Sequence, residues 1–93
     1  MNETAMLAAL KIDLGISADA YDSRLGQYIA SAQSAIETEG VTLEVSQMAD
    51  ANLVVMYAAW LWRKRDSGEG MPRMLRWQLN NRLFSEKAGD ENG

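Results

Sequence analysis

The chain contains one long uncharged apolar run, Leu53-Val-Val-Met-Tyr-Ala-Ala-Trp-Leu-Trp62. The preceding stretch, Ser46-Gln-Met-Ala-Asp-Ala-Asn52, is typical of a helix start, and the basic triplet 63–65 follows the run directly. We therefore predict a helix from about Gln47 to Arg65. At about 100° per residue its apolar side chains face every direction, and such a helix is normally buried on all sides. It is too short to cross a bilayer, which needs about 20 apolar residues, so no membrane partner is expected.

The rest of the chain must supply the cover for this central helix. A length of 93 residues and a hydrophobic content of 47% suit one small folded domain and exclude a disordered chain. We predict an all-α fold, a small bundle of about four helices around the central one, with one side of it left for a neighbouring subunit. Residues 1–87 are expected to form the single domain and polar residues 88–93 a flexible tail.

Enzyme chemistry finds little support in this composition. With no Cys and no His, the chain lacks a thiolate, the commonest general base and the commonest metal ligand. Asp19 and Asp22 suit the start of a helix, and the Gly68-Glu-Gly70 turn lacks the residues of a phosphate-binding loop. We therefore expect no catalytic, cofactor or metal site and no small-molecule substrate. No secretion signal opens the chain, so synthesis in the cytoplasm is expected.

The charges are unevenly distributed. Residues 1–50 carry eight acids and two bases, a net of −6, whereas residues 51–93 carry five acids and seven bases, a net of +2. Such asymmetry on a small domain favours assembly in rings or stacks, or a basic face for an acidic partner. The alternative is that these charges only keep the surface soluble.

The first half of the chain predicts two helices that both end at a glycine. The first is expected from Asn2 or Thr4 to Leu14, with Gly15 adopting the left-handed conformation that ends a helix. The second is expected to run to about Glu39, before Gly40, with Ser17 or Asp19 as its N-cap. It has the cleanest amphipathic pattern of the chain. Its apolar positions are Tyr21, Leu25, Tyr28, Ile29, Ala32, Ala35 and Ile36.

A connector and a further helix complete the predicted bundle. Val41-Thr-Leu-Glu-Val45 alternates like a strand but is too short to form a sheet, so we expect an extended connector, with pairing to a neighbouring copy left open. Ser46 is expected to cap the central helix. The last helix should run from about Pro72, which suits a first turn, to Glu86 or Lys87.

This last helix carries two apolar stripes. Leu75, Leu79 and Leu83 form one stripe and are assigned to the core. The second stripe, Met74, Trp77 and Phe84, is either buried as well or meets another subunit. Because aromatic and arginine side chains are enriched at interface hot spots, we predict a subunit or portal interface here and at the basic triplet. The candidates are Arg63, Lys64, Arg65, Arg73, Met74, Arg76, Trp77, Asn80, Phe84 and Lys87.

The same bases leave two other functions open. A small DNA-binding or packaging-regulatory protein would use them against phosphates, although the last helix is too apolar for a recognition helix and the chain is acidic overall. Its linker, residues 66–71, is also longer than a helix-turn-helix allows. A helical interaction module with another partner is the third reading.

Four segments resemble the small head–tail connector proteins of tailed bacteriophages, also called head-completion or adaptor proteins and sometimes labelled DNA-packaging proteins. They are Leu10-Lys-Ile-Asp-Leu-Gly-Ile16, residues 32–36, Trp60-Leu-Trp-Arg-Lys-Arg-Asp66 and Met71-Pro-Arg-Met-Leu-Arg-Trp-Gln-Leu-Asn-Asn-Arg-Leu-Phe84. The resemblance covers about residues 6–87, and its last segment is the most specific. The tail after Lys87 is shorter than in some relatives.

The resemblance implies a structural subunit without chemistry. Such proteins form a ring of about a dozen copies below the portal, extend the DNA channel and present a surface to the stopper or tail-completion protein. The implied partners are other copies of the chain, the portal and the stopper, with non-specific contact to DNA in the channel. The implied location is the virion, after synthesis in the bacterial host cytoplasm.

Overall fold

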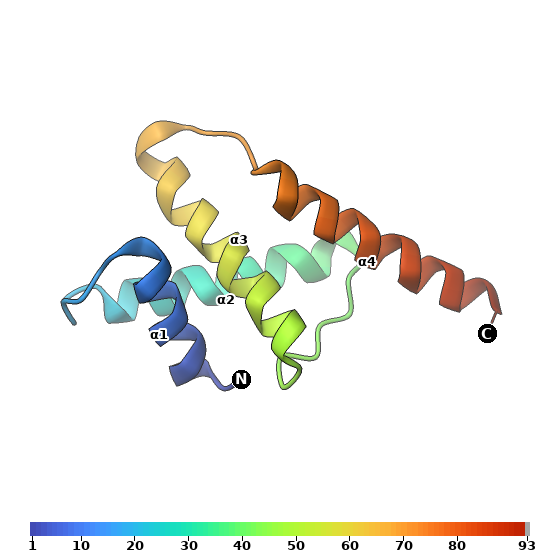
Figure 1. The fold of residues 1–93 in the computed structure, drawn as a ribbon, viewed down its shortest axis with the longest axis horizontal. Helices are drawn as coiled ribbons and strands as arrows, with labels where there is room; N and C mark the ends of the chain where they lie inside the picture. The colour runs from blue at the N-terminus through green and yellow to red at the C-terminus, as the bar shows by residue number, and fades with distance from the viewer. Residues whose placement is uncertain (93) are drawn as a thin grey trace.

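The computed structural model describes the backbone of residues 1–92 and the side chains up to Lys87. It contains four helices: α1 (Glu3–Leu14), α2 (Asp22–Glu39), α3 (Met48–Ser67) and α4 (Arg73–Asn92). They form an elongated bundle of 47 × 28 × 18 Å (Figure 1). The prediction of a small all-α bundle is confirmed.

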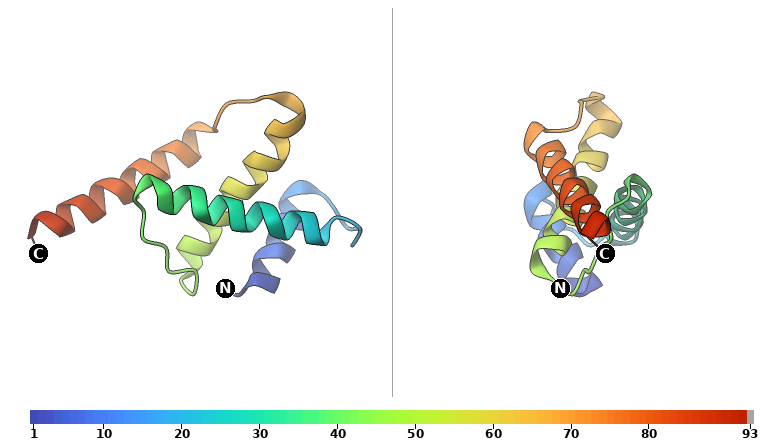
Figure 2. Two further views of the ribbon diagram at one scale, coloured as in Figure 1. Left: turned by 180° about the vertical axis from the view of Figure 1, so that it is seen from behind. Right: turned by 90° about the vertical axis from the view of Figure 1, so that its right-hand side faces the viewer.

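Helix α3 is the centre of this bundle and contacts each of the other three helices (Figures 1 and 2). Most side chains from Ala51 to Ala59 are buried, but Asn52 is exposed and Met56 only partly buried, so one side of the helix is incompletely covered. The end of the run differs, because Trp60, Leu61 and Trp62 are only partly covered. Complete burial of the run was therefore a wrong prediction for Met56 and for its last turn.

Both helix ends at Gly15 and Gly40 are confirmed. Gly15 has φ 70° and Gly40 has φ 114°, and their N–H groups bond back to carbonyl groups of the preceding helix. The N-cap of α1 is Asn2, whose side-chain oxygen accepts a hydrogen bond of 2.8 Å from the N–H of Ala5. These features depend on only a few neighbouring residues, so sequence alone could indicate them.

Two predicted N-caps are wrong. Helix α2 begins at Asp22 without a side-chain cap, and Asp19 instead contributes its backbone carbonyl to the turn before the helix, 3.1 Å from the N–H of Asp22. Helix α3 begins after Gln47, and the hydroxyl of Ser46 bonds to the carboxylate of Glu44 at 3.2 Å. In both cases a turn and a competing polar contact move the helix start towards the C-terminus.

The connector between α2 and α3 is extended and contains no strand. Val41 is buried at one end of it, and Leu43 and Val45 are partly buried. The N–H of Thr42 donates to the carboxylate of Glu86 at 2.8 Å. The connector is thus fixed within the molecule by apolar anchors and by a side chain of α4.

Helix α4 continues to Asn92, five residues beyond the predicted end at Lys87. Leu75 and Leu79 are buried and Leu83 is partly buried, so the first half of the helix packs on the bundle. Its C-terminal end projects beyond the other helices (Figure 1). The side chains of residues 88–93 lie outside the described part of the chain, and the flexible tail stays a prediction.

Candidate functional site

One face of α4 exposes large apolar side chains. Met74 is 59% exposed, Trp77 62% and Phe84 76%, whereas Leu75 and Leu79 on the other face are buried. Burial of both stripes within the domain is therefore wrong. We call Met74, Trp77 and Phe84 the outer face of α4. Phe84 lies two turns after Trp77, on the same side of the helix.

A shallow depression of about 420 Å³ lies at the start of this face and is lined by Arg73, Met74 and Trp77. Arg73 is exposed and forms no ion pair among the described residues. It is the first residue of α4, where the helix dipole disfavours a cation. Its charge therefore has no evident role in stabilising the helix and is available to a partner.

Two other candidates on α4 are engaged inside the molecule. Arg76 forms a bidentate pair with Glu39 at 2.9 and 3.1 Å, and it also donates to the side chain of Asn80 at 3.3 Å. The hydrogen bonds from Arg76 lower the pKa of Glu39. The pair fastens α4 to the C-terminal end of α2, which is a structural role that the sequence did not reveal.

The basic triplet lies on the last turns of α3 and folds back over tryptophans. Lys64 Nζ lies 4.4 Å from the ring centroid of Trp60, and Arg65 Cζ lies 3.8 Å from that of Trp62. Such cation–π contacts contribute about 0.5–1 kcal/mol at exposed sites. Arg65 also pairs with Asp66 at 2.7 Å. All three bases are exposed, but only Lys64 and Arg65 lie over tryptophan rings, so the three bases do not form one uniform surface.

Trp62 is the centre of an aromatic cluster between α2 and α3. Tyr21 and Tyr28 meet its ring edge to face, with centroid distances of 5.8 and 5.4 Å. Pairs of this geometry contribute about 0.5–1.5 kcal/mol beyond the area they bury. The partly covered end of the apolar run therefore packs within this domain, and the guanidinium of Arg65 covers one face of the Trp62 ring.

Sequence reasoning missed a polar cluster at the junction of the connector, α3 and α4. Asp50 is only 6% exposed and pairs with Arg82, which also donates to the carbonyl of Thr42 at 3.0 Å. The N–H of Glu44 donates to Asp50 at 2.7 Å. The available signal was that Arg82 follows Leu79 by three residues and so falls on the core stripe.

The electrostatics of this cluster favour the ionised pair. Burial alone would raise the pKa of Asp50, but the hydrogen bonds from Arg82 and from the N–H of Glu44 outweigh it, and the pKa is lowered. Asp50 is therefore a carboxylate at neutral pH. Because its charge is matched by a guanidinium and a backbone donor, it acts as a fastener for the connector and not as an acid or base.

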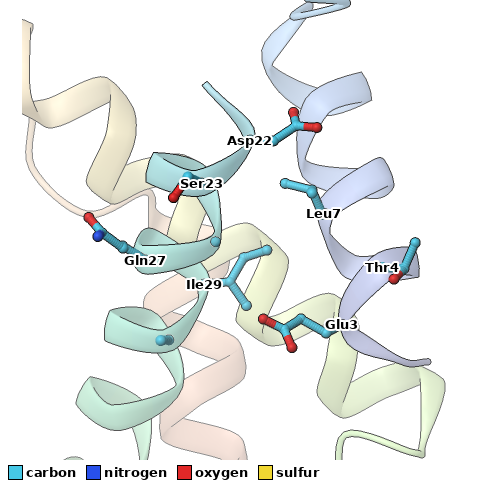
Figure 3. Close-up of a pocket in the computed structure, with 9 residues that line it drawn as sticks. Glu3, Thr4, Leu7, Asp22, Ser23, Gln27 and Ile29 are labelled. Carbon is cyan, nitrogen blue, oxygen red and sulfur yellow. The ribbon is translucent and has the colours of Figure 1, made fainter. Parts of the chain in front are cut away.

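A second depression, of about 530 Å³, lies between α1 and α2 (Figure 3). Leu7 and Ile29 face each other across it from the two helices, and Glu3 stands at its rim (Figure 3). We call this the α1–α2 groove. Its lining residues are Glu3, Thr4, Leu7, Asp22, Ser23, Gly26, Gln27, Ile29 and Ala30.

One end of the groove is closed by ionic contacts. Lys11 Nζ lies 2.8 Å from Asp22 and 3.0 Å from Asp19, which ties the last turn of α1 to the start of α2. The contacts with Asp22 and then Asp19 raise the pKa of Lys11. The two aspartates thus pair with a lysine, in addition to lying near the start of a helix. They do not form a pair of free carboxylates of the kind that catalysis requires.

The ten interface candidates therefore separate into three groups. Arg73, Met74, Trp77 and Phe84 share an exposed side of α4, and the exposed Lys87 follows Phe84 by one turn. The triplet 63–65 lies at the end of α3, with two of its members held over tryptophans. Arg76 pairs with Glu39 of α2, and Asn80 accepts a hydrogen bond from Arg76.

Over the described residues, no helix is both long and apolar enough to span a bilayer. The same part of the chain brings together no group of three acidic side chains that could hold a metal ion. The features that stand out are surfaces: the outer face of α4 and the α1–α2 groove.

Comparison with known proteins assigns the family. A family model described as phage gp6-like head-tail connector protein matches residues 4–72. No curated protein and no solved structure gives a significant match. The match includes α1, α2 and α3 and stops before α4, so it is shorter than the expected 6–87 and omits most of Met71–Phe84. The chain belongs to the phage gp6-like head-tail connector family, whose members are structural components of the virion that assemble with other head and tail proteins.

Proposed function

We propose that this chain is the subunit of a ring that docks below the phage portal, extends the DNA channel and presents a surface to the stopper or tail-completion protein. The observation that supports this most directly is the outer face of α4 in a chain of the connector family. Three large apolar side chains more than half exposed on one helix are unusual for a protein that acts alone.

The outer face has the composition of a binding hot spot. Trp77 is an aromatic anchor, Met74 adapts to irregular surfaces, and Arg73 supplies a charge at the edge. These residues make few contacts inside the molecule, so their presence is better explained by a partner than by the fold. Because a ring repeats each contact, weak individual interfaces give tight binding to the portal through multivalency.

The structure weighs against DNA binding as the main activity. Of the clustered bases, Arg76 and Arg82 are paired with carboxylates, and Arg65 pairs with Asp66. A base that already pairs with a carboxylate neutralises a phosphate poorly, so its approach releases few of the counterions condensed on the DNA. Contact with DNA inside the channel would then be non-specific and secondary to assembly.

The test is to mix the protein with the portal protein from the same gene neighbourhood and to image the mixture by negative stain. We expect wild type to add a cap of density to one end of the portal, and Met74→Ser with Trp77→Ser to lose it. Matched controls are Ile12→Ser and Met48→Ser, which change apolar side chains of similar exposure on α1 and α3. The controls should keep the cap.

Circular dichroism and urea unfolding of each variant separate loss of binding from loss of structure. The double variant should retain its helicity, because both side chains are largely exposed. Bare portals with wild type at high concentration would refute the connector role of this surface. In that event a duplex-binding titration at two salt concentrations would test the DNA reading, which requires a steep salt dependence.

A further inference from the structure

Gly26 occupies a position where glycine has no role inside the molecule. It lies in the second turn of α2, has no positive φ, and a Cβ placed on it would meet nothing within 4 Å. Glycine inside a helix is about 1 kcal/mol less favourable than alanine. Gly40 differs, because its φ of 114° is a backbone conformation that residues with a side chain rarely adopt. Neither backbone conformation nor packing within the described structure requires glycine at position 26.

Gly26 lines the α1–α2 groove, and Ala30 follows it one turn later on the same side. The two small residues let an incoming side chain approach the backbone of α2. Leu7 and Ile29 add apolar surface to the groove. The charged residues of the lining, Glu3 and Asp22, are both acidic, and because Asp22 already pairs with Lys11, Glu3 is the carboxylate that a base of a partner would meet. The groove thus suits an apolar side chain accompanied by a base.

The start of the outer face of α4 has this composition. Trp77 and Met74 are exposed next to Arg73, whose charge has no partner among the described residues. The start of α4 lies across α3 from α1 (Figure 1), and the groove and the start of the outer face share no lining residue, so the two do not meet within one molecule. Contact between them requires a second copy.

We propose that the α1–α2 groove of one copy receives Met74 and Trp77 of the next copy, with Arg73 directed at Glu3. This inference rests on the proposed function and names the two surfaces that meet in it. The contact is heterologous, because different patches meet, and a repeated heterologous contact forms a ring when the rotation between copies closes. Trp77 is 62% exposed, so its burial against Gly26 and Ala30 would remove on the order of 100 Å² of aromatic surface from water.

Cysteine cross-linking tests the pairing in a chain that has no cysteine of its own. The variants are Ala30→Cys in the groove, Met74→Cys on α4, and both together, each assembled on portals and then oxidised. The double variant should give a ladder of disulfide-linked oligomers. A mixture of the two single variants should give dimers, and each single variant alone should give monomers. Dimers from Met74→Cys alone would show a symmetric contact and overturn the proposal.

Filling the groove gives a second, independent measurement. Gly26→Trp should abolish the cap on portals without loss of helicity, because its Cβ points into open space. Ser34→Trp is the matched control, since it adds the same side chain to an exposed position of α2 outside the groove and should assemble normally. Capped portals with Gly26→Trp would overturn the proposed pairing but not the proposed function. Capped portals with the double cysteine variant that give no disulfide ladder would do the same. Bare portals with wild type would overturn both the pairing and the proposed function.

Discussion

At the scale of single residues, the pair of Asp50 and Arg82 determines how the connector is held. Arg82→Leu leaves the carboxylate of Asp50 nearly buried with one backbone donor. Breaking a buried pair in this way typically costs about 3–5 kcal/mol. Because a third of the Arg82 side chain is exposed, we expect about 3 kcal/mol, the lower end of that range, in urea unfolding. Arg24→Leu, at an exposed site where the side chain donates one hydrogen bond to Gln27 among the described residues, should change stability by less than about 0.5 kcal/mol. Equal effects would mean that the pair contributes no specific stability.

The lowered pKa values of Glu39 and Asp50 predict a loss of stability in acid. Their ordinary values are 4.5 and 3.8, and Arg76 and Arg82 hold both lower in the folded protein. As the pH falls, these carboxylates therefore bind protons in the unfolded chain before they do so in the folded protein. Their contribution to stability is complete above about pH 5 and is lost as the pH falls through 4 and below. Urea midpoints measured from pH 6 to pH 3 should fall less steeply for Glu39→Gln than for wild type. Glu37→Gln removes an exposed acid from the same helix and is the control; an identical slope for Glu39→Gln and wild type would contradict the assignment.

At the scale of the helices, two glycines of α2 should respond oppositely to one substitution. Gly26→Ala should stabilise the protein by about 1 kcal/mol, since alanine is the better helix former and its Cβ meets nothing. Gly40→Ala should destabilise it by about 1–2 kcal/mol, because φ is 114° and the new Cβ would lie 3.3 Å from Leu83 Cδ2. Thermal unfolding of the two variants side by side measures both effects. Two shifts of the same sign would show that local helix preference does not control this element.

Local signals account for what sequence could predict of these helices. The ends at Gly15 and Gly40 depend on one residue and its neighbours, and the burial of Leu75 and Leu79 follows from helical spacing. The starts of α2 and α3 were missed because they depend on competition: Asp19 and Ser46 had other partners available after folding. The continuation of α4 beyond Lys87 was missed because its polar composition lacks the apolar spacing that marks a packed helix.

At the scale of the whole molecule, sequence predicted the candidate interface residues by their type. The fold determines which of them are exposed and which are paired inside the molecule. Sequence could place Trp77 and Phe84 on a second stripe, but only tertiary packing shows that this stripe faces solvent. It could not separate Arg73 from Arg76, although one is exposed and the other pairs with Glu39. Ion pairs between residues far apart in the chain leave no local pattern. The family match covers α1, α2 and α3, so the helix that carries the outer face lies beyond the matched region.

The three tryptophans of the chain occupy two kinds of surroundings, and this has an optical consequence. Trp60 and Trp62 are partly covered, each with a cation over its ring and at least one tyrosine beside it, whereas Trp77 stands largely in water. Indole emission moves to shorter wavelength when water is removed from around the ring. The fluorescence of Trp77 is therefore an intrinsic reporter of whether the outer face of α4 has been covered, readable without any attached dye.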